Sequence, residues 1–262
     1  MIIPIYQADA FTEKLFGGNP AAVCPLEEWL PDTTMQNIAM ENNLAETAFI
    51  VKENDQYHIR WFTPAVEVAL CGHATLAAAH IYMNQLGHNE PQITFNSKSG
   101  LLKVIRQHDK KLTLDFPADR YNRVQSIPPA VTEGLKVAVS ELYKGSFDYM
   151  AVVADQKTVE ELIPDFKTIA TLPSRGIIVT ATGDASDFVS RGFFPQSGID
   201  EDPVTGLAHT LLVPYWSGQL HKQRMTAIQL SARRGYLECQ LAGDRVLMSG
   251  YAVTYLQGTI NI

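Results

Sequence analysis

The sequence predicts an α+β protein of two pseudo-symmetric halves, each a curved mixed β-sheet or barrel wrapped around a central apolar helix. Three observations predict this fold. A short segment near residue 60 is repeated near residue 191. Each half contains one long uncharged stretch with the length of a buried helix. Short apolar or alternating segments, which have the pattern of β-strands, surround both stretches.

The repeat is clearest in two six-residue segments, Ile59-Arg60-Trp61-Phe62-Thr63-Pro64 and Ser190-Arg191-Gly192-Phe193-Phe194-Pro195. The offset between their arginines is 191 − 60 = 131, half of the 262-residue chain, and at this offset Cys71 corresponds to Asp202. The match resumes at 235 − 100 = 135, where Gly100 corresponds to Gly235. Chance similarity between two amphipathic patterns is the alternative. The several identities at each offset favour an internal duplication.

The elements of the first half follow from apolar patterning and turn residues. Strands are predicted at residues 2–7, 21–25, 47–52, 58–62, 92–96, 101–107 and 111–116. Residues 33–43 are predicted as a helix with a threonine cap. Residues 73–86 are predicted as the central helix, ended by Gly87.

The second half repeats this order around a helix predicted at residues 205–217. Residues 117–129, rich in Pro, Arg and Asp, are predicted as a linker. We therefore divide the chain into lobes at 1–117 and 118–262, and leave open whether the last strand returns to the first lobe. Both central helices are apolar nearly all round, which predicts burial on every side. If the halves face each other, both helix starts lie near one cleft, the default place for a ligand.

Composition restricts the class of partner. The formal net charge is −7 with a pI near 5.5, and no basic cluster appears, which argues against nucleic acid. The N-terminus has no signal-peptide pattern, and the uncharged stretches contain Gly and His at spacings unlike a membrane span. Three scattered cysteines suggest neither a disulfide framework nor a zinc cluster. We expect a reduced, cytoplasmic protein that binds a small molecule.

The starts of the central helices, near Gly72 and Gly206, are candidate ligand sites. Free backbone N–H groups and the positive end of the helix dipole make each start a place where an anion can bind. Glycine lets a ligand approach the backbone closely. A substrate that carries a carboxylate would fit such a site.

Three side chains near these starts have both a structural and a functional interpretation. Asp202 is an ordinary acidic N-cap before Pro203, or a site residue because the repeat sets it opposite Cys71. His73 is a satisfied polar group in an apolar helix, or reaches the cleft from the first turn. Glu46 is a surface residue, or a carboxyl at the start of a buried strand. Burial raises a carboxyl pKa, as acid/base chemistry near neutral pH requires.

Four segments together resemble the phenazine-biosynthesis (PhzF-like) isomerase family: Gly18-Asn19-Pro20-Ala21-Ala22-Val23, Asn43-Leu44-Ala45-Glu46-Thr47-Ala48-Phe49, Phe62-Thr63-Pro64 with Gly72-His73-Ala74-Thr75, and Asp200-Glu201-Asp202-Pro203-Val204-Thr205-Gly206. The match keeps the motif order and runs from the first strand to the last. The resemblance implies a two-lobed fold shared with diaminopimelate epimerase, each lobe a sheet around a central helix.

The resemblance also implies a reaction. Glu46 would be the acid/base that moves a proton between carbons of a small carboxylate-bearing substrate, while His73 and Asp202 help to bind it and shuttle protons. The residues implied in substrate binding are Asn19, Gly72, Thr205 and Gly206. No metal, no organic cofactor and a homodimer are implied. The namesake enzyme isomerises a dihydro-hydroxyanthranilate, and its pattern has Ser where this chain has Leu207, so we leave the substrate open.

Two other functions stay open. An amino-acid epimerase or racemase of the two-thiol type would need a Cys at each helix start, and only Cys71 is present. A non-catalytic small-ligand-binding protein could use the same scaffold, although it would not need an acid/base Glu46. A metal site is not expected, because the spacing of the nearby cysteine and histidines (Cys71, His73, His80 and His209) matches no closed ligand set.

Overall fold

The computed structural model describes residues 1–262 and has the predicted α+β fold. The chain forms two compact units. The first comprises Met1–Asp115 and Ser249–Ile262, and the second comprises Phe116–Met248. The end of the chain therefore belongs to the first unit, a point that the sequence alone left open.

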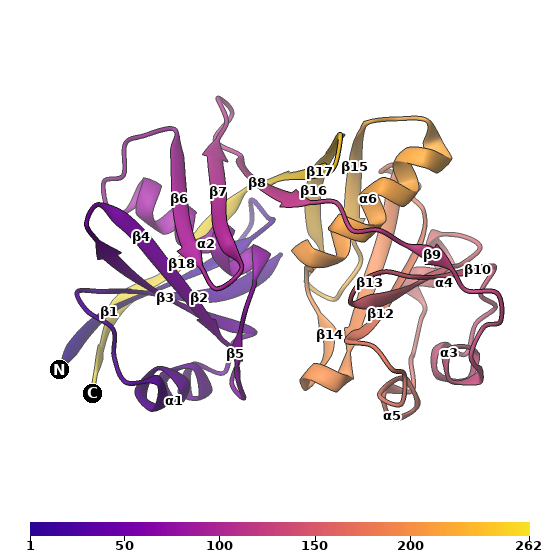
Figure 1. Ribbon diagram of the computed structural model, residues 1–262, viewed down its shortest axis with the longest axis horizontal. Coiled ribbons are helices and arrows are strands. Elements are labelled where there is room, and N and C mark those ends of the chain that lie inside the picture. The colour runs from indigo at the N-terminus through magenta and orange to yellow at the C-terminus, as the bar shows by residue number, and fades with distance from the viewer. The chain divides into compact units, whose positions relative to one another are not determined.

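The first unit contains a mixed sheet around one central helix (Figure 1). Its strands are β1 (Ile2–Ala10), β2 (Asn19–Leu26), β3 (Glu46–Glu53), β4 (Gln56–Phe62), β5 (Glu67–Val68), β6 (Gln92–Ser97), β7 (Gly100–Arg106), β8 (Leu112–Pro117), which extends past Asp115, and β18 (Ala252–Asn261). Strand β1 lies between β18 and β2 and is antiparallel to both. Strands β2 and β3 are parallel, β3 and β4 antiparallel, and β4 and β6 parallel.

Two helices pack against this sheet. Helix α2 (Gly72–Asn84) is buried along almost its whole length, as its uncharged sequence predicts. Helix α1 (Asp32–Asn42) buries Met35 and Ile38 in a cluster with residues of β1 and β3. It begins one residue earlier than predicted, and no side chain caps it. The predicted threonine cap is wrong, because Pro31 precedes the helix and its carbonyl accepts the first N–H bonds.

The second unit has the same kind of architecture. Its strands are β9 (Asn122–Arg123), β10 (Glu141–Lys144), β11 (Asp148–Val152), β12 (Gly176–Thr182), β13 (Phe188–Phe194), β14 (Ile199–Asp202), β15 (Arg224–Gln229), β16 (Gly235–Ala242) and β17 (Arg245–Gly250), which extends past Met248. Its helices are α3 (Pro129–Leu135), α4 (Gln156–Glu160), α5 (Phe166–Ile169), the 3-10 turn η1 (Pro195–Ser197) and α6 (Gly206–Leu220). The predicted linker is partly ordered as a strand, since β9 pairs with β10.

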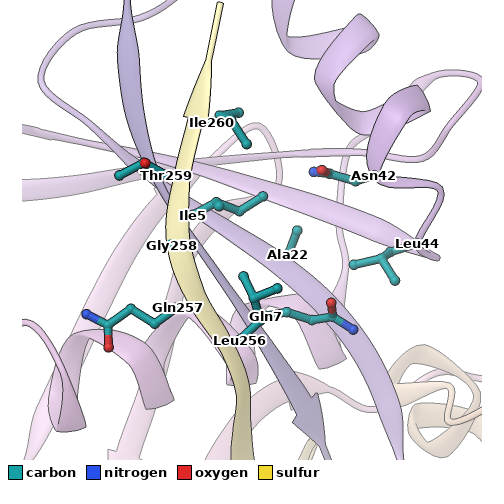
Figure 2. Close-up of a pocket in the computed structure, with 10 residues that line it drawn as sticks. All are labelled: Ile5, Gln7, Ala22, Asn42, Leu44, Leu256, Gln257, Gly258, Thr259 and Ile260. Atoms are coloured by element: carbon teal, nitrogen blue, oxygen red, sulfur yellow. The ribbon is translucent and has the colours of Figure 1, made fainter.

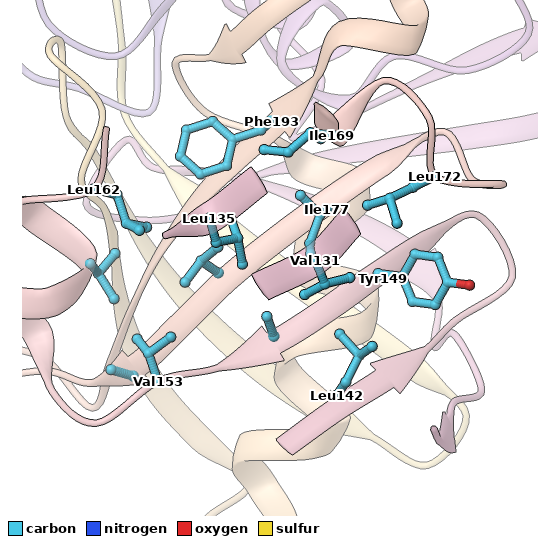
Figure 3. Packing of buried hydrophobic residues seen from close by; sticks show 14 of the residues in the cluster. Val131, Leu135, Leu142, Tyr149, Val153, Leu162, Ile169, Leu172, Ile177 and Phe193 are labelled. Atoms are coloured by element: carbon cyan, nitrogen blue, oxygen red, sulfur yellow. The ribbon is translucent and has the colours of Figure 1, made fainter. Parts of the chain in front are cut away.

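The core of the second unit lies between the sheet and the short helices (Figure 3). Val131 and Leu135 of α3 and Ile169 of α5 pack against Ile177 and Phe193 of β12 and β13. Helix α6 is apolar and largely buried from Gly206 to Trp216, with Pro214 inside it, and it is exposed at Gly218 and Gln219. None of the helices combines the length and the apolar character needed to cross a bilayer.

The same succession of strand pairings occurs in both units. In the first unit, neighbouring strands of the series β1–β2–β3–β4–β6 pair in alternating directions, beginning with an antiparallel pair. In the second unit, the series β10–β11–β12–β13–β15 alternates in the same way. The central helices, however, begin at Gly72 and Gly206, an offset of 206 − 72 = 134. Cys71 therefore corresponds to Thr205 and not to Asp202. The three extra residues match the length of η1, a turn that follows β13.

Candidate active site

The first cluster of predicted site residues lies at the start of three elements of the first unit. Parallel pairing of β2 with β3 sets Glu46 beside Ala21, two residues after Asn19. The first turn of α2 supplies His73. The residue before Asn19 must be a glycine. Gly18 has a φ of +57°, and a Cβ there would lie only 2.0 Å from the carbonyl oxygen of Ala10.

Glu46 and His73 form a buried ion pair. Glu46 Oε2 lies 3.1 Å from His73 Nε2, and the two side chains are only 12% and 4% exposed. The surface interpretation of Glu46 is therefore wrong, because its side chain is largely buried against His73. His73 has a polar neighbour at each ring nitrogen, Glu46 at Nε2 and Asn19 at Nδ1, so both of its interpretations stay open. Buried groups of this kind are typical of sites that handle protons.

The other ring nitrogen of His73 faces two groups. Asn19 Nδ2 lies 3.1 Å from Nδ1, and Cys71 Sγ lies 3.5 Å from it. In the neutral ring, the amide donates to Nδ1, and the ring proton is on Nε2 and faces Glu46. In the protonated ring both nitrogens donate, and Cys71 Sγ is an acceptor within reach of Nδ1. The contact with Nδ1 gives Asn19, which is fully buried, a place in the cluster.

The charge of His73 depends on its neighbours. Burial works against protonation, whereas the negative charges of an ionised Cys71 and of Glu46 favour it, and the balance raises the pKa of His73 well above 6.5. Burial also raises the pKa of Cys71 to about 11.

The cluster is a poor metal site. The ligand atoms of Glu46, Cys71 and His73 lie within 4.8 Å of one another. Cys71 faces Nδ1 of the ring, however, and Glu46 faces Nε2. Ligands of one ion must converge on a single point, and groups on opposite ring nitrogens do not. The imidazole lies between two titratable groups, Cys71 at Nδ1 and Glu46 at Nε2.

The second cluster lies in the second unit, where β14 leads into α6. Asp202, which is 8% exposed, is the last residue of β14, and Thr205 is the N-cap of α6. The Thr205 hydroxyl donates to Asp202 Oδ2 at 2.6 Å. Interpretation of Asp202 as the N-cap is wrong, because the helix begins at Gly206, three residues after Pro203.

Two further residues hold this cluster. His209 lies one turn into α6, and its Nδ1 is 2.9 Å from the carbonyl oxygen of Thr205. Burial lowers the pKa of His209 to about 4, so Nδ1 carries the proton and donates to that carbonyl. Gln229 of β15 contacts both Asp202 and Thr205. Sequence reasoning missed Gln229, although an amide at an inward position of an apolar strand was a usable signal.

The structure thus groups Asn19, Glu46, Cys71 and His73 in the first unit, with Gly72 as the first residue of α2. In the second unit it groups Asp202 with Thr205, and Gly206 is the first residue of α6. His80 is apart from the first cluster, since it contacts Asn84 and Thr254.

A separate cavity of about 340 Å³ lies in the first unit beside β1, β2, β18 and the end of α1 (Figure 2). Its polar lining consists of uncharged side chains, among them Gln7, Asn42 and Gln257. None of the predicted site residues lines it. No charged side chain lines it to balance a carboxylate, so we do not assign the substrate to this cavity.

Comparisons with known proteins identify similar chains over the full length. A family model described as phenazine biosynthesis-like protein matches residues 8–258. An uncharacterised isomerase of Pseudomonas aeruginosa is 49% identical over 262 residues, which cover 100% of each chain. The crystal structure of a PhzF-family phenazine biosynthesis protein from Enterococcus faecalis matches with a TM-score of 0.96 at 45% identity, again over 100% of each chain.

The fold extends to enzymes of lower similarity. A hydroxyproline epimerase from Agrobacterium vitis, solved with bound trans-4-hydroxy-L-proline, matches with a TM-score of 0.64. The match covers 99% of this chain and 92% of that one at 9% identity, so it shows the fold alone.

Proposed function

We propose that this chain, which belongs to the phenazine biosynthesis-like protein family, moves a proton between carbon atoms of a small carboxylate-bearing substrate, with Glu46 as acid and base. The chain is an isomerase, like its relative from Pseudomonas aeruginosa. The observation that carries the proposal is the pair of Glu46 and His73, two largely buried side chains whose facing atoms lie 3.1 Å apart. A carboxylate of this kind is available to take a proton from a substrate.

In this scheme Glu46 carries the proton from one carbon to the other. The Glu46 carboxylate takes a proton from one carbon as a C–H bond breaks and an O–H bond forms, and the electron pair delocalises into the substrate. The same carboxyl then gives the proton to a second carbon, which restores the carboxylate. The protonated His73 ring, 3.1 Å away, offsets the negative charge that develops on the substrate.

The start of α2 and the start of α6, each in its own unit, are candidate places for a substrate carboxylate. The backbone N–H groups after Gly72 and Gly206 are donors for a carboxylate, and neither glycine has a side chain to block the approach. Asn19 contacts the ring of His73. The Thr205 hydroxyl donates to the Asp202 carboxylate, and we assign Asp202 to proton shuttling. The natural partner of the protein would then be a small metabolite with at least one carboxylate.

The proposal is tested by separating binding from turnover. Wild type and Glu46→Gln are compared with a panel of small hydroxy acids, amino acids and dihydro-hydroxyanthranilate, with binding followed by calorimetry and conversion by NMR. The amide keeps the size of the side chain but cannot accept a proton. We expect turnover to fall by about 10²- to 10⁴-fold while binding changes little.

The control is Glu41→Gln, the same change at an exposed residue of α1, which should turn over substrate like wild type. Normal turnover by Glu46→Gln would place the base elsewhere. A ligand that both proteins bind without converting it, across the whole panel, would favour a binding protein.

A further inference from the structure

Gln229 occupies an inward position near the end of β15 and is 1% exposed. Its neighbours on the same face, Met225 and Ala227, are buried apolar residues. An uncharged amide in such a position is costly unless its hydrogen-bonding atoms are satisfied. Both ends of the Gln229 amide are satisfied by the turn between β14 and α6.

The contacts fix the orientation of the amide. The backbone N–H of Thr205 can only donate, so the atom that faces it at 2.8 Å is the amide oxygen of Gln229. The amide nitrogen therefore faces the carbonyl oxygen of Asp202 at 2.7 Å and the hydroxyl oxygen of Thr205 at 3.2 Å. Both of those atoms accept from it.

The orientation of the amide fixes the orientation of the hydroxyl. A hydroxyl has one hydrogen, and the oxygen of Thr205 already accepts a hydrogen from Gln229. Its own hydrogen is then directed to Asp202 Oδ2, 2.6 Å away. Gly192, which pairs with Asp202, leaves room for this contact, since a Cβ there would lie 3.2 Å from the Thr205 hydroxyl oxygen.

We propose that Gln229 is a positioning residue that holds the Thr205 hydroxyl as a hydrogen-bond donor to the Asp202 carboxylate. Gln229 acts through Thr205 and does not itself take part in the proton transfer. The inference rests on the proposed function in one respect, the assignment of Asp202 to proton shuttling.

The turn has a second anchor, which separates positioning from folding. The Ser231 hydroxyl donates to the carbonyl oxygen of Pro203 at 2.8 Å. A change at Gln229 that preserves its size therefore leaves the turn attached to the strand. The consequence of such a change then falls on the contacts that the amide makes with Thr205 and with the carbonyl oxygen of Asp202.

The decisive variant is Gln229→Glu, which keeps the shape and replaces the amide nitrogen by an oxygen. At a pH at which the new carboxyl is ionised, that oxygen repels the carbonyl of Asp202 and competes for the Thr205 hydrogen. We expect a crystal structure of the variant to show the hydroxyl contact to Asp202 lost. We expect kcat to fall by about 10- to 100-fold, the range for loss of one hydrogen bond to a charged group, with KM little changed.

Two comparisons complete the experiment. Gln219→Glu makes the same change at an exposed residue of α6 and should leave the kinetics and the turn as in wild type. In an Asp202→Asn background, Gln229→Glu should lower kcat by no more than about twofold, because the residue on which it acts is gone.

The outcomes are distinguishable. An equal loss of kcat in the wild-type and Asp202→Asn backgrounds, or a structure of Gln229→Glu in which the hydroxyl still contacts Asp202, would overturn the inference. If Asp202→Asn alone leaves kcat unchanged, the role of Asp202 in the proposed function fails. The crystal structure of Gln229→Glu then decides the inference by itself.

Discussion

His73 is the residue through which the electrostatics of the first cluster can be measured. Burial opposes its charge, and Glu46, 3.1 Å away, favours it. In wild type the ring stays protonated above pH 6.5. Glu46→Gln removes one of the two neighbours that favour the charge, the other being Cys71, so the pKa of His73 should fall. Nitrogen-15 NMR of the histidine ring across pH measures both values.

The control for this titration is His80. Burial lowers its pKa to about 4, and it contacts Asn84 and Thr254, not Glu46. Its titration should be the same in both proteins. An unchanged His73 titration in Glu46→Gln would contradict the coupling.

Cys71 is the residue on which an epimerase of the thiol type would depend. Burial raises the pKa of its thiol to about 11, so little thiolate exists at pH 7. We predict slow alkylation by iodoacetamide at pH 7, with a rate that rises through pH 9 and 10, and turnover by Cys71→Ala within about tenfold of wild type. Fast alkylation at pH 7, together with loss of turnover in Cys71→Ala, would support the thiol mechanism instead.

At the scale of elements, the pair of β4 and β5 is held by Arg60 and Glu67. The guanidinium donates to both carboxylate oxygens, at 2.8 and 2.9 Å. This bonding lowers the pKa of Glu67 to about 2. Arg191 and Glu201 form the same paired contact between β13 and β14. Each ion pair thus fixes the short strand that precedes a central helix.

The Glu67 pair predicts how stability depends on pH. A carboxyl with a lowered folded-state pKa contributes stability above its unfolded value of 4.5, and this contribution is lost as pH falls through about 2. We predict that Glu67→Gln is less stable than wild type at pH 6 and that the difference shrinks between pH 4.5 and pH 2. Urea unfolding at several pH values checks this. A constant difference would show that the charge of Glu67 does not matter.

The elements also show what the sequence could and could not predict. The central helices were predictable because an uncharged, apolar segment has no polar side to expose. The threonine cap of α1 was not, because Pro31 and Thr33 are both acceptable at a helix start. The correspondence of Cys71 with Asp202 failed because η1 lengthens the turn after β13 without changing the residues on either side.

The sites were predictable to different degrees for a related reason. Glu46, His73 and Asp202 lie within motifs whose residue types can be recognised in the sequence. Gln229 is separated from Thr205 by 24 residues and meets it only because β15 packs beside the start of α6. Contacts of this kind depend on strand register, which a single sequence does not specify.

At the scale of the whole chain, β18 closes the first unit with residues from the opposite end of the sequence. It pairs with β1 from Ile2 to Ala10, and the N–H of Ile262 donates to the carbonyl of Met1 at 2.9 Å (Figure 1). Deletion of Ser249–Ile262 should therefore unpair one edge of β1. We predict faster amide hydrogen exchange in β1 and β2 and a lower melting temperature.

The second unit supplies the internal control for this deletion. Its strands β12 and β13 do not pair with β18, so their amide exchange should stay slow. Unchanged protection of β1 would show that β18 is not needed to stabilise the first unit.

The central claim is that Glu46 transfers a proton to and from carbon, and exchange with heavy water tests it most directly. Wild type and Glu46→Gln are incubated side by side in heavy water with the same panel of small carboxylates, and deuterium at carbon is followed by NMR. We predict incorporation by wild type with at least one compound and none by Glu46→Gln. Incorporation at equal rates by both proteins would contradict it.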